Sequence, residues 1–375
     1  MNLLFITPRY HPHIGGVEYI VKSIIERLVM KGHNVTVLCG EPGLDNPREE
    51  WINGVHVFRW PVWAPGDAYY IPKMRSKLKS WLLNIVKRCD VIHFHSVHSV
   101  LTIYSSEVLK SCEVHKVLTP HYHGTGHTLI RRILWQAWRG YVRRALCSAS
   151  LIHTVSAVES KLILQDFNVE SITIEHGVEE WLFEVDWFPS NYVMYSGRIE
   201  RYKNVHRLAN VVRILNKKGL DLELKIFGRG PYASRLMKHL NSIKIKYEMM
   251  PPQPYKEYIT YLTRATLLGL LSEKEAYGVT VNEANAVGVP VVVVEPWGLN
   301  FSGRSRTLIT QLYKSDEVLA KEIIVFLDEV RKQPKSEVPS WNQVVDAYIE
   351  RLYCPQEGLD SRPKDHLLSR SYKFC

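Results

Sequence analysis

Short apolar runs alternate along this chain with longer segments whose apolar residues recur at helical spacing. In the first half, residues 17–31 predict a helix that ends at Gly32, and apolar runs predict strands at residues 3–7, 34–39, 91–94, 117–118 and 151–155. Alternating strands and helices form parallel sheets that are covered by helices on both faces. The pattern therefore predicts an α/β fold.

The same alternation begins again near residue 191. Strands are predicted at residues 191–195, 222–227 and 289–294, and helices at residues 205–217 and around 235–240, while residues 265–271 are apolar again. A chain of 375 residues is also too long for one ordinary core. We predict two Rossmann-like domains, at residues 1–185 and 186–340, that face across a cleft holding the ligands at the carboxyl ends of the strands. Residues 341–353 predict an amphipathic helix, and residues 354–375 a poorly ordered tail.

The charge and cysteine content narrow the choice of partner and compartment. A formal charge of +10 favours anionic partners, but it equally fits basic residues that solvate the surface. The basic residues are spread out and lack interleaved aromatic residues, which argues against nucleic acid. The six cysteines form no C-x-x-C pair, and residues 1–10 lack a basic start, so we expect a cytoplasmic protein with reduced thiols and no signal peptide.

Two basic segments raise the question of a membrane. Residues 73–88 hold six lysines and arginines and no acidic residue, and residues 129–144 are also basic and contain tryptophan. In the first segment one helical face carries Met74, Leu78, Trp81, Leu82 and Ile85. Such a helix can lie in the interface of an anionic bilayer, here the inner face of the membrane. It can equally pack on the N-terminal sheet with its lysines in water. No apolar stretch approaches the ~20 residues of a membrane span.

The most informative segment is residues 275–284, EAYGVTVNEA, which a Gly-Val-Pro triplet follows at 288–290. Glu275 and Glu283 stand on either side of a glycine-containing turn that opens a helix. The amides near Gly278 and Val279 can hold a phosphate, because the first amides of a helix have no partner within the helix. Glu283, one turn into the helix, can accept hydrogen bonds from a sugar diol.

This segment resembles the E-x7-E motif of the retaining glycosyltransferases of family 4, and the resemblance extends from residue 3 to residue 353. It implies the GT-B fold, a nucleotide-sugar donor held by the C-terminal domain, and a last helix that crosses back to the first domain. It also implies that Glu283 binds the ribose and that Glu275 contacts the transferred sugar. Residues 196–204 resemble the G-R-x4-K motif, so that Arg198 and Lys203 neutralise the donor diphosphate, where fixed cations stabilise the developing charge.

Other segments match the family less specifically. Gly15 and Gly16 resemble its N-terminal glycine-rich loop, which places Gly16 at the donor, and residues 119–121 resemble a T-x-H segment whose histidine lies near the sugar. His121 is the candidate by position, with His123 and His127 as alternatives. Departures from the family leave the choice between UDP- and GDP-sugars open, and they lie at His176, Arg229, Ala276 and residues 295–300.

The expected activity is transfer of a hexose with retention of configuration, to a glycan or a lipid-linked acceptor, with no cofactor. Two alternatives stay open: a GT-B sugar-nucleotide epimerase, and a basic binding protein of this fold without catalysis. A phosphorylase would need a lysine for pyridoxal phosphate, and no segment suggests one. His93 and His95 alternate on a predicted strand and could ligate a metal, but no third ligand or D-x-D segment accompanies them, so we predict a metal-independent enzyme.

Overall fold

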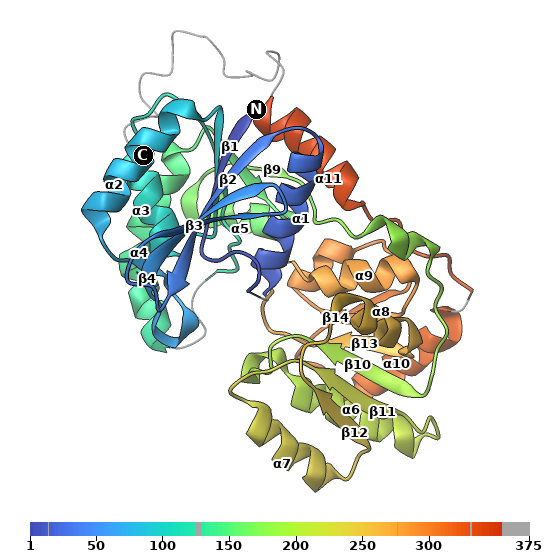
Figure 1. Cartoon of the computed structure of the whole chain (residues 1–375). Helices are drawn as coiled ribbons and strands as arrows, with labels where there is room; N and C mark the ends of the chain where they lie inside the picture. Colours follow the sequence, from blue (N-terminus) through green and yellow to red (C-terminus); the bar gives the residue numbers. More distant parts are fainter. Residues whose placement is uncertain (14, 125–128, 276, 331, 355–375) are drawn as a thin grey trace, which may run out of the picture. The chain divides into compact units, whose positions relative to one another are not determined.

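The computed structural model describes residues 1–13, 15–124, 129–275, 277–330 and 332–354. It divides into two compact units, which we call unit 1 (Met1–His176 with the segment from Trp341) and unit 2 (Gly177–Ser340). Figure 1 shows an α/β arrangement in each. None of the helices described by the structure is long and apolar enough to cross a membrane.

The division between the units lies before Gly177, not at the predicted boundary of 185/186. The reason is local packing, because the 3-10 helix η3 (Glu180–Glu184) packs on the helix α9 (Val279–Val287) of unit 2. The connecting backbone is also held there: the Val178 amide donates to the Pro339 carbonyl oxygen at 3.0 Å, and the Lys335 ammonium donates to the Val185 carbonyl oxygen at 2.8 Å.

Unit 1 is built on one sheet with the strand order β3-β4-β2-β1-β6-β7-β8-β9, and β5 pairs with β4. Strands β1, β2, β4, β6, β7, β8 and β9 pair in parallel, whereas β3 and β5 run antiparallel to β4. The strands are β1 (Asn2–Thr7), β2 (Asn34–Pro42), β3 (Arg48–Ile52), β4 (Val55–Trp63), β5 (Ile71–Pro72), β6 (Val91–His95), β7 (His115–Thr119), β8 (Leu151–Thr154) and β9 (Ile172–Thr173).

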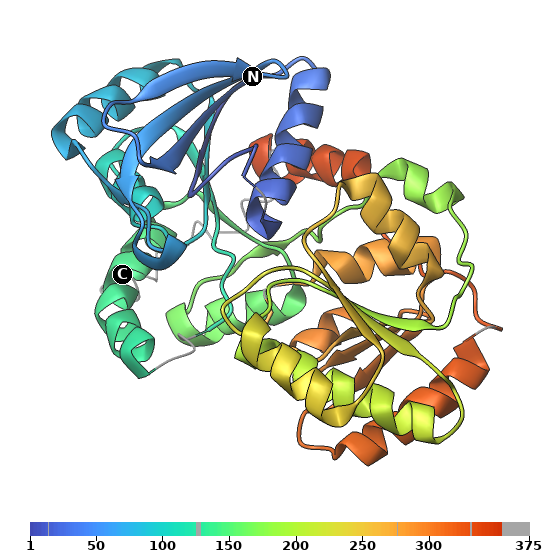
Figure 2. The ribbon, with the colours of Figure 1, turned by 60° about the horizontal axis from the view of Figure 1, so that its bottom comes forward.

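The helices of unit 1 lie on both faces of this sheet (Figures 1 and 2). Helix α1 packs on α11, and α3 lies between α2 and α4. They are α1 (Gly16–Met30), α2 (Arg75–Ile85), α3 (Val100–Leu109), α4 (Leu129–Ser148), α5 (Ala157–Phe167) and α11 (Trp341–Tyr348), with short turns η1 (Pro65–Asp67), η2 (Val86–Arg88) and the π-helix η6 (Ile349–Tyr353). The predicted helix at 341–353 is thus α11 continued by η6, and it belongs to the core of unit 1.

Unit 2 is built on a second, fully parallel sheet with the order β12-β11-β10-β13-β14-β15. Its strands are β10 (Tyr192–Ser196), β11 (Glu223–Phe227), β12 (Tyr247–Met250), β13 (Leu267–Leu270), β14 (Val291–Val294) and β15 (Thr307–Thr310). Helices α6, α7 and α10 cover one face and α8 and α9 the other (Figure 1). The remaining elements are α6 (Val205–Lys217), α7 (Ala233–Ile243), α8 (Tyr255–Arg264), α10 (Asp316–Val330), η4 (Arg201–Lys203) and η5 (Trp297–Phe301).

Each sheet contains one point where the direction of strand addition reverses. In unit 2 the chain starts at β10, adds β11 and β12 on one side, and then continues with β13 on the other side. In unit 1 the corresponding point lies between β1 and β6. Loops that leave two such strands diverge at their carboxyl ends, and open α/β sheets bind ligands there. This topology directs attention to the loops after β10 and β13, and after β1 and β6.

Candidate active site

An ion pair joins the two loops that leave the reversal point of unit 2. Lys203 lies in η4 after β10, and Glu275 lies in the loop after β13. The Lys203 ammonium is 2.5 Å from Oε1 of Glu275. The backbones of the two loops are linked as well, because the Glu273 amide donates to the Tyr202 carbonyl oxygen at 2.9 Å. The structure therefore brings together two residues that are 72 positions apart in the sequence.

The two predicted cations of this site differ in exposure. The Lys203 side chain is only 11 % exposed. Burial alone would lower the pKa of Lys203. The charge of Glu275 and its hydrogen bond, together with Tyr202 and Glu200, outweigh burial and raise the pKa overall, so the lysine is cationic at neutral pH. Arg198 is 71 % exposed and pairs with Glu200 at 3.1 Å. An exposed guanidinium can turn toward an incoming anion at little cost, whereas Lys203 is already held in place.

Glycine makes the loop that carries Arg198 possible. The loops after β10 and β11 lie backbone against backbone, with the Gly197 amide donating to the Phe227 carbonyl oxygen at 2.9 Å. Gly228 has a φ of +149°, and a Cβ atom there would lie 1.9 Å from the Gly197 carbonyl oxygen. Only glycine allows this approach, which explains why glycine follows β11 at residue 228.

Helix α9 carries the second predicted glutamate. It begins at Val279, and its N-cap Gly278 has a φ of +108°, which favours glycine. Glu283 is 4 % exposed, and the Tyr258 hydroxyl of α8 donates to its Oε2 at 3.1 Å. Burial raises the pKa of Glu283 to about 7, although hydrogen bonds from Tyr255 and Tyr258 act in the opposite direction. Ala276, between the two glutamates, lies outside the described residues.

The sequence analysis missed the tyrosines of α8. Tyr255 and Tyr258 stand three positions apart on one helix, which predicts that they share a face but does not say what they face. Their relation to Glu283 depends on the packing of α8 against α9. A buried carboxyl such as that of Glu283 needs hydrogen-bond partners. This requirement predicts that partners exist but does not identify them in the sequence.

The remaining predicted residues belong to unit 1. Gly16 is the first residue of α1, directly after the loop that leaves β1. His121 follows β7 and is 6 % exposed, with a positive φ of 50°. Its Nε2 lies 3.2 Å from Nδ1 of His95 at the end of β6. The alternative His127 lies outside the described residues. Thus His121 is held by β6, the strand beside β1 at the reversal point of unit 1.

Buried histidines surround His121. His93, His95, His153 and His176 are all at most 1 % exposed, and burial lowers the pKa of each, in the case of His153 to about 4. The pKa of His121 is lowered to about 3, chiefly by burial and then by His153. These imidazoles are therefore neutral at pH 7.

The predicted alternative of a metal at His93 and His95 does not fit the geometry. Nδ1 of His93 lies 2.7 Å from the Tyr353 hydroxyl, and Nε2 lies 2.7 Å from the Thr119 hydroxyl, so both ring nitrogens have protein partners. Within the described part of the chain, no group of three histidine, cysteine, aspartate or glutamate side chains is arranged to hold a metal ion. His93 instead fastens η6 to the sheet.

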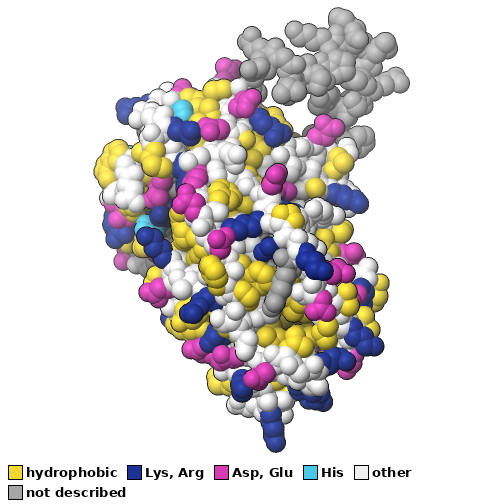
Figure 3. Space-filling view, turned by 90° about the vertical axis from the view of Figure 1, so that its right-hand side faces the viewer, with side chains coloured by type: hydrophobic (Ala, Val, Ile, Leu, Met, Phe, Trp, Pro, Cys, Tyr) yellow, Lys and Arg dark blue, Asp and Glu magenta, His cyan; other side chains and the backbone are white. Residues whose placement is uncertain are grey.

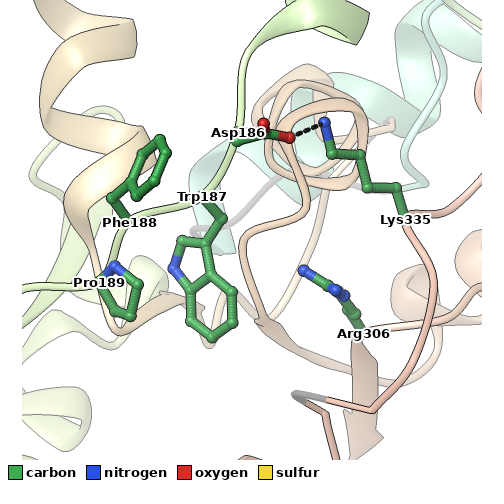
Figure 4. Close-up of a pocket in the computed structure, with 6 residues that line it drawn as sticks. All are labelled: Asp186, Trp187, Phe188, Pro189, Arg306 and Lys335. Carbon is green, nitrogen blue, oxygen red and sulfur yellow. Dashed lines mark ion pairs between the residues drawn. The ribbon is translucent and has the colours of Figure 1, made fainter.

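A cavity of about 510 Å³ lies elsewhere in unit 2 (Figure 4). None of the predicted site residues lines it, and its two cations already have partners in the protein. The Lys335 ammonium pairs with Asp186 at 2.9 Å, and Arg306 donates to the Gly288 carbonyl oxygen at 2.6 Å. The lining residues are Asp186, Trp187, Phe188, Pro189, Arg306 and Lys335.

The raised pKa of Glu283 predicts a pH-dependent stability. Between pH 4.5 and about 7 the folded state keeps a proton that the unfolded state has lost, so Glu283 makes the fold less stable as the pH rises through this window. Glu283→Gln stays neutral, and its free energy of unfolding relative to wild type should rise by about 2–3 kcal/mol from pH 5 to pH 8. Urea unfolding of both proteins at pH 5 and pH 8 measures this difference in free energy of unfolding. The same difference at both pH values would contradict the raised pKa of Glu283.

Comparison with known proteins identifies the family of this chain. Residues 14–180 match the family described as Glycosyltransferase Family 4, and residues 179–329 match Glycosyl transferases group 1. The chain is 24 % identical over 336 residues to an uncharacterized glycosyltransferase of Methanocaldococcus jannaschii, covering 80 % of this chain and 82 % of that protein.

Two solved structures share the fold. A sucrose-phosphate synthase from Thermosynechococcus elongatus is similar with a TM-score of 0.67 and 17 % identity, over 94 % of both chains. A protein of Anabaena in complex with UDP and glucose is similar with a TM-score of 0.64 and 14 % identity, over 92 % of both chains. Since the two family matches together span residues 14–329, this chain belongs to the glycosyltransferases of the family 4 type, with the GT-B fold and a nucleotide-sugar donor.

Proposed function

We propose that this glycosyltransferase takes a UDP- or GDP-sugar and transfers a hexose with retention of configuration and without a metal ion. The observation that carries the proposal is the partly buried ion pair of Lys203 and Glu275 at the reversal point of the second sheet. A cation and a carboxylate fixed 2.5 Å apart can hold two different parts of one ligand, an anionic diphosphate and a hydroxyl-bearing sugar.

Each residue then has a separate role. Lys203 and Arg198 neutralise the diphosphate, and the first amides of α9, near Gly278 and Val279, add hydrogen bonds to it. Glu283, whose burial is only partly offset by the hydrogen bonds from α8, accepts from the ribose hydroxyls. Glu275 orients the transferred sugar. In unit 1, Gly16 at the start of α1 offers amides to the donor, and His121 lies at the sugar.

The proposed reaction proceeds on one face of the sugar. The bond from the anomeric carbon to the diphosphate oxygen breaks, and the acceptor oxygen forms its bond on the same side. The proton of the acceptor hydroxyl passes to the departing diphosphate oxygen. No side chain forms a covalent intermediate, and the catalytic contribution of the protein is to stabilise the negative charge that develops on the leaving group.

Removal of either cation should slow turnover. We expect Arg198→Ala and Lys203→Ala each to lower kcat roughly 10²-fold or more, the scale of losing one donor to a developing charge. The reduction in kcat of the double variant should be smaller than the product of the two single reductions, because both side chains act on one diphosphate. Lys225→Ala is the matched control, since Lys225 pairs with Glu223 at 3.2 Å on β11 without being assigned to the site. The assay uses the UDP- or GDP-sugar that gives the largest thermal shift, and wild-type rates in both single variants would refute the roles.

Turnover should also survive excess EDTA, because fixed cations take the place of a divalent ion at the diphosphate. The measurement compares initial rates with and without EDTA at saturating donor. If EDTA abolishes the activity and Mg²⁺ or Mn²⁺ restores it, the proposed independence from metal is wrong.

A membrane-bound acceptor is the second part of the proposal, and helices α2, α3 and α4 support it. The apolar face predicted for α2 is not available to a bilayer, because Leu78 and Leu82 are fully buried and the Trp81 ring packs at 4.7 Å from that of Phe58. Its exposed face is basic, with Lys77 and Lys79 in solvent.

Helix α4, in contrast, exposes apolar side chains. Ile133 is 64 % exposed, Leu134 52 % and Tyr141 49 %. The last turns of the helix add exposed Arg143 and Arg144. Since α3 packs against both α2 and α4, these features lie along one row of helices. We therefore place the anionic bilayer against this row, with α4 supplying apolar contacts and α2 supplying charge.

Binding to vesicles tests this surface. Each Lys or Arg near an anionic bilayer contributes ~1 kcal/mol, so the triple charge reversal of Lys73, Lys77 and Lys79 to Glu should strongly reduce co-sedimentation with anionic vesicles. Ile133→Ser with Leu134→Ser should reduce it independently of salt. Reversal of Lys217 and Lys238, on helices α6 and α7 of unit 2, together with Lys244 directly after α7, serves as the matched control. No pelleting, or equal pelleting with neutral vesicles, would refute a charged membrane surface.

The alternative is a basic binding protein of this fold without catalysis. On the face shown in Figure 3, lysine and arginine side chains are interspersed with aspartate and glutamate and form no continuous basic track. Retention on nucleic acid without turnover of any nucleotide sugar would favour that alternative.

A further inference from the structure

One indole side chain touches both ends of the loop that carries Glu275. This loop runs from Ser272, just after β13, to Gly278, the N-cap of α9. Trp297, in η5 after β14, donates from Nε1 to the Ser272 carbonyl oxygen at 2.7 Å. Its ring also reaches the other end, because a Cβ atom at Gly278 would lie 3.0 Å from Cζ3 of Trp297. Trp297 is 1 % exposed.

The same end of the loop is held from a second direction. Arg304 donates from Nη1 to Oδ1 of Asn282 at 2.6 Å, in the first turns of α9. It also donates from Nη2 to the Tyr277 hydroxyl at 3.3 Å. The Phe301 ring fills the space between, at 5.3 Å from the Tyr277 ring and 6.1 Å from the Trp297 ring.

These contacts restrict the loop before any ligand arrives. Without Trp297, the segment from Ser272 to Gly278 would lose its hydrogen bond at Ser272 and its packing at Gly278. It would keep the link from Glu273 to Tyr202 and the contacts of Arg304 beyond its far end. Glu275 would then be fixed mainly by its ion pair with Lys203, and that lysine is the group the diphosphate needs. If Glu275 were held only by Lys203, it would move when Lys203 turned toward the diphosphate of a bound donor.

We infer that Trp297, assisted by Arg304, is a positioning residue that fixes Glu275 and the start of α9 for the sugar-transfer step. The inference rests on the proposed function, because it assigns Glu275 to the transferred sugar. Trp297 acts through the backbone at Ser272 and Gly278 and contacts no substrate. It does not support the Glu283 side chain, which α8 holds through Tyr258. The ribose and the transferred sugar therefore depend on different supports, while the diphosphate keeps its two cations, Arg198 and Lys203.

The test compares Trp297→Phe with Trp187→Phe. Trp187 makes the same kind of bond at the opposite end of the same strand, donating to the Ala265 carbonyl oxygen at 2.7 Å just before β13. Trp297→Phe should lower kcat between roughly tenfold and a hundredfold, the effect of displacing a reacting group slightly. The Kd for UDP or GDP, measured by calorimetry, should change less than about threefold. Trp187→Phe should leave kcat unchanged.

Amide hydrogen exchange gives a readout that needs no turnover. In Trp297→Phe, peptides covering residues 272–279 should exchange at least about tenfold faster than in wild type, with the rest of unit 2 unchanged. Arg304→Lys keeps the charge but loses the guanidinium that donates to both Asn282 and Tyr277. It should speed exchange in peptides covering residues 277–282. The inference is overturned if kcat is unchanged, if nucleotide affinity falls as much as kcat, or if exchange rises throughout unit 2 in both tryptophan variants. A wild-type chain that turns over no nucleotide sugar would refute the proposed function, and the exchange experiment would still decide whether Trp297 fixes the loop.

Discussion

The reversal of strand order in each parallel sheet is the constraint on which the rest of this molecule depends. Parallel neighbours require a crossover helix, so consecutive loops at the carboxyl edge lie on the same side until the chain reverses. In the sheet of unit 2, two adjacent loops leave in opposite directions at β10 and β13, and those loops carry Lys203 and Glu275. The ion pair between residues so distant in sequence is a consequence of topology.

Burial then decides how the charges of this site behave. Lys203 stays cationic in its buried position because Glu275 is beside it, so each residue makes the burial of the other tolerable. Glu283 has no such cation, and burial raises its pKa to about 7. The free protein therefore holds one compensated pair and one carboxyl that is half protonated near neutral pH. A nucleotide whose ribose donates two hydrogen bonds would stabilise the ionised form of Glu283, so donor binding and the protonation of this residue are coupled.

Much of this could be predicted from the sequence, and what could not has a physical reason. The buried run Val291–Val294 and the alternation around it identify parallel strands without any structure, because strands covered on both faces are apolar throughout. The edge strand β3 was missed, since residues 48–52 mix charged and aromatic side chains as solvent-facing strands do. The predicted domain boundary lies too late in the chain. The packing of η3 on α9, which places η3 in unit 2, is a tertiary contact that the sequence does not reveal.

The site shows the same division between local and tertiary information. The positions of Lys203, Glu275 and Glu283 could be proposed because each motif joins a strand end to a helix start, which is local. Trp297 could only be recorded as a departure from the family, because its two contacts lie 25 and 19 residues back along the chain, at Ser272 and Gly278. An indole needs more space than the small residues that are usual in the family at this segment. Here the indole packs against the loop that carries Glu275. Trp297 belongs to the segment that differs from the family and that leaves the identity of the donor undecided from the sequence. In the folded protein the same residue supports the catalytic loop.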